Sequence, residues 1–82
     1  MLQPSAHGRI HSELISLLRS RREKIGMSMT LLAEKSGLSL SMISFVERGL
    51  RMPTLETLLR IAEALDVDLW KLLLTATGAA RK

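Results

Sequence analysis

A stretch of four residues, SGLS at 36–39, constrains the possible folds more than any other part of the chain. Glycine readily takes the left-handed conformation that ends a helix, and serine is a preferred capping residue at the start of the next. Gly37 and Ser39 therefore predict that one helix ends and another begins within about three or four residues, the spacing of a helix-turn-helix. Any compact all-helical domain also needs tight turns, so the spacing alone leaves both interpretations open.

Five helical segments are expected, and their boundaries carry residues typical of helix ends. Gly26 and Gly49 predict ends, whereas Asp68 and the pair Pro53–Thr54 predict starts. Apolar residues between these positions recur at helical spacing, which favours an all-α fold class. The helices are expected at roughly 9–25, 29–36, 40–48, 55–65 and 69–74, forming one helix-turn-helix domain at 9–74 between a flexible N-terminus at 1–8 and a flexible tail at 75–82.

Composition indicates a small helical domain with an aliphatic core. The 82 residues suit one domain, and one Phe, one Trp and no Tyr leave Leu, Ile, Met, Val and Ala to fill the core. The absence of Cys excludes disulfides and cysteine-based zinc sites and fits a reducing cytoplasm. No apolar run reaches about 20 residues, and the N-terminus lacks a signal-peptide core, so no membrane segment is expected. In the fourth segment the core-facing stripe is expected to be Leu55, Leu58, Leu59, Ala62 and Leu65.

The net charge of +4 is concentrated in the N-terminal half. Residues 1–25 hold five basic and two acidic side chains, residues 26–53 hold three and two, and residues 54–82 hold four of each. A basic half beside a neutral half indicates a partner that carries phosphates at one end of the molecule. A positive surface that is simply solvated explains the same distribution equally well.

Arg22 and Glu47 are expected to form a buried ion pair. Arg22 shares one face of the first segment with Leu14 and Leu18, so it lies in an apolar stripe. Glu47 follows the inward-facing Val46 of the third segment. Because either charge alone would be costly to bury, the two side chains are expected to pair and to have a structural role.

The chain from RREKIG to DLWKLL resembles the Xre/Cro family of bacterial and phage helix-turn-helix regulators. The likeness covers about residues 10–74, and its most specific parts are LAEKSGLS, IS, ERG, the helix-opening Pro53 and LLRIAEALDV. The resemblance implies a five-helix, lambda-repressor-like domain that binds operator DNA, usually as a homodimer, with its third helix in the major groove. It also implies the buried pair of Arg22 and Glu47.

Several positions expected to contact DNA depart from the family pattern. Met29 stands where a glutamine usually follows the serine cap of the second helix, and Leu40 and Phe45 replace polar or basic residues of the third. Without amide or guanidinium groups, this surface is expected to read thymine methyl groups and DNA shape, and to favour A·T-rich half-sites. The expected DNA-binding residues are Ser28, Met29, Ser39, Leu40, Ser41, Ser44, Phe45, Arg48, Arg51 and Thr54.

The two arginines after the third segment are expected to bind phosphates. Arg48 and Arg51 flank the turn that follows this helix, and Arg51 is also placed to enter a narrow minor groove. Helix starts near Ser28 and Thr54 are expected to add backbone N–H groups. The alternative is that both arginines are solvated loop charges.

Phe45 has more than one possible role. Its ring is expected either to contact thymine methyl groups or to fold back onto the second helix and cover Met29. A third possibility is that Leu40, Met42 and Phe45 form an apolar patch that binds another protein.

The fifth segment, LWKLLL, is apolar nearly all round and therefore needs cover on two sides. A second copy of the same surface would supply this cover in a two-fold dimer. Its two reading helices would lie about 34 Å apart, one turn of the duplex. The alternative is a monomer in which Trp70 lies back over the first helix, near Ile15. The expected dimer interface comprises Leu69, Trp70, Leu73 and Leu74.

The expected function is therefore a homodimeric regulator of transcription that binds double-stranded DNA at a near-palindromic operator, as a restriction–modification controller or a phage repressor does. The alternative is a protein-interaction module, as in an antitoxin, that uses the apolar third-helix surface. No catalytic residues, cofactor or small-molecule ligand are expected. His7 and His11 have a spacing found among metal ligands, but no third ligand accompanies them, so no metal site is expected.

Overall fold

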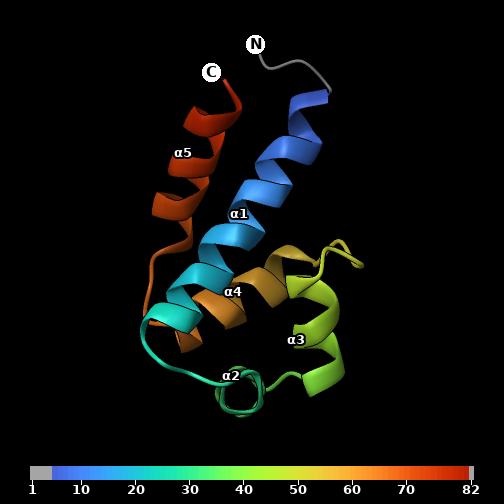
Figure 1. Cartoon of the computed structure of the whole chain (residues 1–82), viewed down its shortest axis with the longest axis vertical. Helices are drawn as coiled ribbons and strands as arrows, with labels where there is room; N and C mark the ends of the chain where they lie inside the picture. Colours follow the sequence, from blue (N-terminus) through green and yellow to red (C-terminus); the bar gives the residue numbers. More distant parts are fainter. Residues whose placement is uncertain (1–4, 82) are drawn as a thin grey trace.

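The computed structural model describes residues 5–81, and these form five α-helices. α1 (Ser5–Lys24) and α5 (Leu69–Ala80) run side by side in opposite directions and make the long arm of the molecule (Figure 1). α2 (Met29–Ser36), α3 (Leu40–Glu47) and α4 (Leu55–Ala64) gather around the C-terminal end of α1. The expected all-α, five-helix fold is confirmed, with α2 and α3 as the helix-turn-helix.

Of the five helices in the described part of the chain, four end in the same hydrogen-bonded turn. After α2, Leu38 N–H donates to Ala33 O at 3.1 Å, and Gly37 N–H donates to Glu34 O at 3.3 Å. Gly37 has a φ of 73°, in the left-handed region. This pair of bonds is a Schellman motif, which satisfies carbonyls that a helix end leaves without partners. Corresponding bonds follow α1, α3 and α4, whose left-handed residues are Gly26, Gly49 and Asp66.

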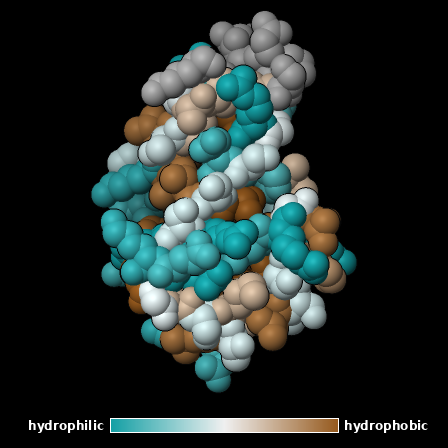
Figure 2. Space-filling view, viewed as in Figure 1, coloured by the Kyte–Doolittle hydropathy of each residue, from teal (hydrophilic) through white to brown (hydrophobic). Residues whose placement is uncertain are grey.

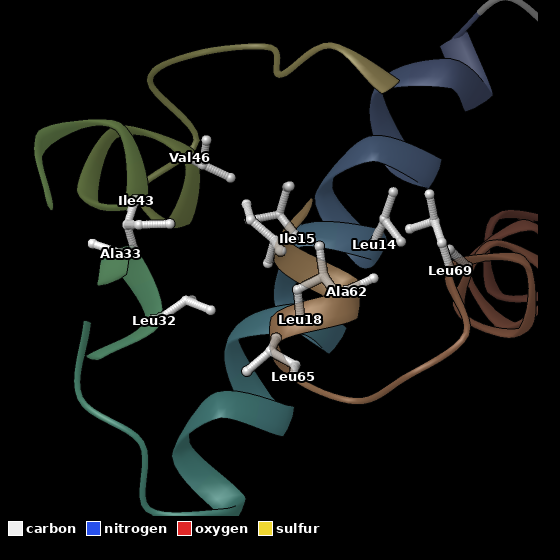
Figure 3. Packing of buried hydrophobic residues seen from close by; sticks show 12 residues of the cluster. Leu14, Ile15, Leu18, Leu32, Ala33, Ile43, Val46, Ala62, Leu65 and Leu69 are labelled. Atoms are coloured by element: carbon white, nitrogen blue, oxygen red, sulfur yellow. The ribbon is translucent and has the colours of Figure 1, made fainter. Parts of the chain in front are cut away.

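The core lies where α1 meets the helix-turn-helix and α4 (Figure 3). Leu32 of α2, Ile43 of α3 and Leu65 after α4 are almost completely buried. Burying such a side chain contributes roughly 1.5–3 kcal/mol relative to leaving it in water. Leu38, in the turn between α2 and α3, packs against the same cluster. The core therefore sets the angle at which α3 leaves α2.

The expected ends of the first and last helices are wrong. α1 begins at Ser5, earlier than expected, and α5 continues through the expected tail to Ala80. Ala76 and Ala80 lie on one face of α5 and are buried, as is Ala6 near the start of α1. Tertiary contacts between the two helices thus stabilise helical turns that local propensity alone does not predict. The remainder of the expected flexible ends, residues 1–4 and 82, lies outside the described residues.

The expected core stripe of α4 is only partly correct. Ala62 and Leu65 are buried and Leu58 packs against the core, but Leu55 and Leu59 are exposed. The apolar face of α4 is wider than the surface that the rest of the chain covers, so its remaining part faces an open groove beside α5.

No helix within residues 5–81 is both long and apolar enough to cross a membrane.

Candidate nucleic-acid interface

Hydroxyl side chains cap the N-terminal ends of α2, α3 and α4. Ser28, Ser39 and Thr54 precede α2, α3 and α4, and the oxygen of each accepts a hydrogen bond from the backbone N–H three residues later, at 3.0–3.1 Å. The Thr54 hydroxyl also donates to Thr57 Oγ1 at 3.1 Å. Each of the three hydroxyls thus has a structural role within the chain itself, as an N-cap. Neighbouring N–H groups of each first turn have no helical acceptor, which leaves partial positive charge at these ends.

α3 presents one face to the core and the other to solvent. Ile43 and Val46 point inward and are buried, whereas Leu40 is 48% exposed at the start of the outward face. Ser41 on this face is also exposed, and Ser44 is half-buried. The outward face therefore combines one large apolar side chain with two small hydroxyl groups.

The Phe45 ring lies beneath two guanidinium groups. The Cζ atoms of Arg48 and Arg51 are 5.6 Å and 5.7 Å from the ring centroid, within the range of cation–π interactions. Met29, which Phe45 was expected to cover in one of its alternative roles, is half-buried and packs against the core. Sequence reasoning missed the association of Phe45 with the two arginines, although their spacings of three and six residues were visible.

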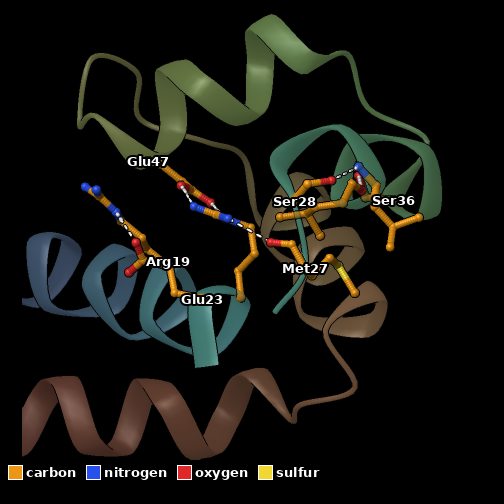
Figure 4. Close-up of polar contacts among 9 residues, drawn as sticks. Arg19, Glu23, Met27, Ser28, Ser36 and Glu47 are labelled. Carbon is orange, nitrogen blue, oxygen red and sulfur yellow. Dashed lines mark hydrogen bonds and ion pairs between the residues drawn. The ribbon is translucent and has the colours of Figure 1, made fainter. Parts of the chain in front are cut away.

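Arg22 and Glu47 form the expected pair at the junction of α1 and α3 (Figure 4). Arg22 Nε donates to Glu47 Oε2 at 2.6 Å and Nη2 donates to Oε1 at 2.9 Å, while Nη1 donates to the Met27 carbonyl oxygen at 2.8 Å. The two side chains are 12% and 10% exposed. Hydrogen bonding to Glu47 raises the pKa of the Arg22 guanidinium, outweighing the opposing effect of burial. The pair therefore holds α3 against α1.

The outward face of α3 is bordered by two arginines that form no ion pair within residues 5–81. Glu47 is the only acidic residue between positions 35 and 55, and it is bound to Arg22. Arg48 and Arg51 are exposed, and no carboxylate of residues 5–81 lies within ion-pair distance of either. Such a surface attracts a polyanion.

A second surface, the α4–α5 groove, lies apart from this face. It has a volume of about 760 Å³ and is lined by Leu55, Leu59, Trp70 and Leu73 among others. Trp70 is 64% exposed, so the alternative in which it lies back over α1 is wrong. Leu69, expected at the dimer interface, is instead buried in the core of the chain itself, where it packs in the main hydrophobic cluster.

Among the residues that line the α4–α5 groove but were not expected site residues are two exposed leucines of α4. Leu55 and Leu59 stand one helical turn apart, and the sequence pattern placed them in the core stripe. Only their exposure in the folded chain distinguishes them from Leu58. In residues 5–81 no three His, Cys, Asp or Glu side chains are grouped so as to hold a metal ion.

The tight α2–α3 turn, the exposed face of α3 and its unpaired arginines define a DNA-binding helix-turn-helix domain of the kind found in transcriptional regulators. The chain belongs to the helix-turn-helix family, whose model, described as "Helix-turn-helix", matches residues 18–69. The resemblance drawn from the sequence is thereby confirmed.

Relatives and solved structures agree with this assignment. An uncharacterised HTH-type transcriptional regulator of Mycobacterium tuberculosis is 51% identical over 53 residues, which make up 65% of this chain and 38% of that relative. The chain thus spans less than two fifths of the relative's length. The clp gene regulator ClgR of Corynebacterium glutamicum has a TM-score of 0.75 at 31% identity, over 85% of this chain and 91% of that one. The restriction–modification controller protein C.Esp1396I has a TM-score of 0.74 at 28% identity, over 82% and 90%.

Proposed function

We propose that this protein regulates transcription by binding operator DNA as a homodimer, with α3 in the major groove. The observation that carries this proposal is the outward face of α3, which is bordered by Arg48 and Arg51, neither of which has a carboxylate of residues 5–81 within ion-pair distance. A major groove about 12 Å wide admits an α-helix. A structure of C.Esp1396I bound to a 25 base pair operator site, with a TM-score of 0.73 to this chain, supports this mode of binding.

Phosphate contacts supply most of the affinity in this proposal. Arg48 and Arg51 bind the phosphates of the DNA backbone on one side of α3. The N-terminal turns of α2 and α4 direct peptide N–H groups at other phosphates. The N-caps Ser28 and Thr54 keep these first turns in place. Such contacts fix the position of α3 but carry no sequence information directly.

Sequence preference comes from contact and shape in this proposal. Leu40 is exposed enough to touch a thymine methyl group, and Ser41 and Ser44 each offer one hydroxyl with little preference between bases. The half-sites are therefore A·T-rich. A strict requirement for guanine opposite Leu40 would contradict this mechanism.

The α4–α5 groove is the dimer interface in this proposal. Trp70 of α5 lines this groove together with the exposed Leu55 and Leu59 of α4, and Leu74, four residues after Trp70 on the same helix, is also exposed. A two-fold axis at this surface lets each protomer cover the apolar side chains of the other, as an isologous interface requires. The interface thus consists of Trp70, Leu73 and Leu74 of the expected set, with Leu55 and Leu59 added.

The alternative, a protein-interaction module that uses the α3 surface, has less support. Met42 packs against the core, and Phe45 lies beneath two arginines, so Leu40 is the main free apolar side chain on this face. The two functions respond differently to salt. Affinity for DNA falls by roughly 0.9 log units per log unit of salt for each neutralised phosphate, whereas apolar docking changes little.

Selection of bound duplexes from a random DNA pool at moderate salt tests the proposal. We expect enrichment of an A·T-rich near-palindrome with half-site centres about 34 Å apart, one duplex turn. A pool that never enriches, together with salt-insensitive capture of a protein by the α3 face, would favour the interaction module instead.

A further inference from the structure

We propose that Phe45 is a positioning residue that holds Arg48 and Arg51 together as a phosphate-binding clasp, and contributes to DNA affinity through these arginines rather than by touching a base. This inference rests on the proposed DNA-binding function and names a role within it. The two guanidinium carbons lie 5.6 Å and 5.7 Å from the ring centroid, so neither arginine is favoured over the other.

The backbone after α3 brings the second arginine back to the ring. Leu50 N–H donates to Phe45 O at 2.9 Å, and Gly49 N–H donates to Val46 O at 3.0 Å. Gly49 has a φ of 70°, which a side chain would strain, and this lets the chain reverse direction directly after the helix. Arg51, six residues after Phe45, therefore lies over the same ring as Arg48, which follows Phe45 by one helical turn.

Electrostatics favour an aromatic ring as the support for two like charges. Two guanidinium groups near each other repel, and a protein usually offsets this with a carboxylate. Within residues 5–81 the nearest acid in sequence, Glu47, is already bound to Arg22. The π face of a phenyl ring attracts each cation without neutralising it. The C-terminal end of α3 adds partial negative charge close to Arg48. Both guanidinium groups thus keep their full charge and their N–H donors for a phosphate.

Holding the arginines in place changes the affinity for DNA. A long, free arginine side chain loses conformational freedom when it is fixed against a phosphate, and this loss weakens binding. The ring restricts both side chains before DNA arrives, so less freedom is lost on binding. If the ring acted through thymine methyl groups instead, its effect would not depend on the arginines.

A double-mutant cycle on DNA binding tests this dependence. The probe is a fluorescently labelled duplex from the selected pool, titrated with the full chain at fixed salt. We expect Phe45→Leu, which keeps apolar bulk but removes the ring, to weaken binding about tenfold. In the Arg48→Ala/Arg51→Ala background the same change should weaken binding by less than about twofold, because the ring has nothing left to hold. Phe45→Trp should retain the parent affinity, since Trp is the strongest partner for cations.

Each outcome of the cycle decides the question. A tenfold loss that persists in the double arginine variant overturns the inference and assigns Phe45 to base contact. Unchanged affinity for Phe45→Leu, with the parent chain binding DNA normally, also overturns it. Thermal unfolding of Phe45→Leu by circular dichroism, close to that of the parent, excludes a loss of fold. If its stability falls, Phe45→Met, which also removes the ring but keeps apolar bulk, repeats the test. Failure of the parent chain to bind any duplex would refute the proposed function rather than the role of Phe45.

Discussion

At the scale of single residues, the roles of Arg22, Arg48 and Arg51 follow from the side chains that each contacts. Arg22 makes two hydrogen bonds to the Glu47 carboxylate and a third to a carbonyl oxygen, so it joins two helices. Arg48 and Arg51 rest on a ring and keep their charge for a ligand. Because the pKa of Arg22 is raised, its stabilising contribution is present at every pH below the ordinary arginine value and is lost only at higher pH. This arginine therefore adds no pH dependence to stability near neutrality.

Removing one member of the buried pair should destabilise the fold strongly. We expect Glu47→Ala to lower the free energy of unfolding by about 3–5 kcal/mol, because it leaves the Arg22 charge buried without its partner. Urea denaturation followed by circular dichroism measures this change. Glu23→Ala is a matched control, since Glu23 pairs with Arg19 at 3.8 Å with both side chains more than half exposed. The control should lose less than about 1 kcal/mol. Equal losses in the two variants would contradict the structural role.

Asp66 is the one non-glycine residue with a positive φ in the described chain, at 56°. A side chain in the left-handed region is strained, and glycine is not. We expect Asp66→Gly to raise the free energy of unfolding by roughly 0.5–1 kcal/mol, measured by the same denaturation. Asp66→Ala removes the same charge but keeps the strain, so it should give no gain. A gain in both variants would instead point to the charge of Asp66.

At the scale of elements, the helix ends hold the site together. Schellman turns end α1, α2, α3 and α4. A serine or threonine N-cap begins each of the helices α2, α3 and α4. The turn between α2 and α3 needs its glycine most, because a Cβ at Gly37 would also lie 3.2 Å from Arg60 Nη1. Arg60 donates a long hydrogen bond of 3.4 Å from that atom to the Ser36 carbonyl oxygen, at the end of α2.

Substitution of two glycines should change stability in opposite directions. We expect Gly37→Ala to destabilise the fold by about 1–2 kcal/mol, because alanine is strained at a φ of 73°. Gly78→Ala, in the helical body of α5 with open space around the new Cβ, should stabilise by up to about 1 kcal/mol. Thermal unfolding of the two variants beside the parent measures both effects. Destabilisation by Gly78→Ala would show that α5 is not helical there in solution.

At the scale of the whole molecule, the proposed function uses one surface to bind DNA and another to form the dimer. The outward face of α3 carries free positive charge, and the α4–α5 groove carries exposed apolar side chains. Hydrophobic side chains also gather at the tip of the loop between α3 and α4, where Leu50 and Met52 are exposed (Figure 2). Exposed leucines thus occur both inside and outside the α4–α5 groove, which supplies matched variants for the dimer.

Leu55→Glu should dissociate the proposed dimer. Leu55 lines the α4–α5 groove and is 63% exposed, so the fold of the chain tolerates a charge there. In the proposed dimer the new carboxylate would be buried, in a groove that Glu63, Asp66 and Asp68 already line with negative charge. Leu50→Glu is the matched control, because Leu50 has the same 63% exposure but lies outside the groove. This variant should sediment with the same mass as the parent protein. Sedimentation velocity of both variants and the parent gives the oligomeric state. A parent that is monomeric at all concentrations would refute the interface.

Trp70 offers an internal probe of the same interface. It is the single tryptophan of the chain and is 64% exposed in the protomer. We expect its fluorescence emission to shift to shorter wavelength as the protein concentration rises, because association would remove its ring from water. The shift should be absent in Leu55→Glu. Emission that does not depend on concentration would place Trp70 outside any interface.

The residue pattern was enough to predict the features that depend on local physics. Glycine and hydroxyl residues located the turns, the apolar period predicted an all-α fold, and the cost of burying a charge predicted the partners Arg22 and Glu47. Features that depend on which surfaces the rest of the chain covers became apparent from the packing of the helices. Local periodicity cannot distinguish the exposed Leu59 from the core-packed Leu58. It also cannot predict that contacts between α1 and α5 stabilise extra turns of both helices, or that the turn after α3 places Arg51 over the ring of Phe45. Such features arise when separate segments meet, and apolar periodicity within one segment does not show which of its faces another segment will cover.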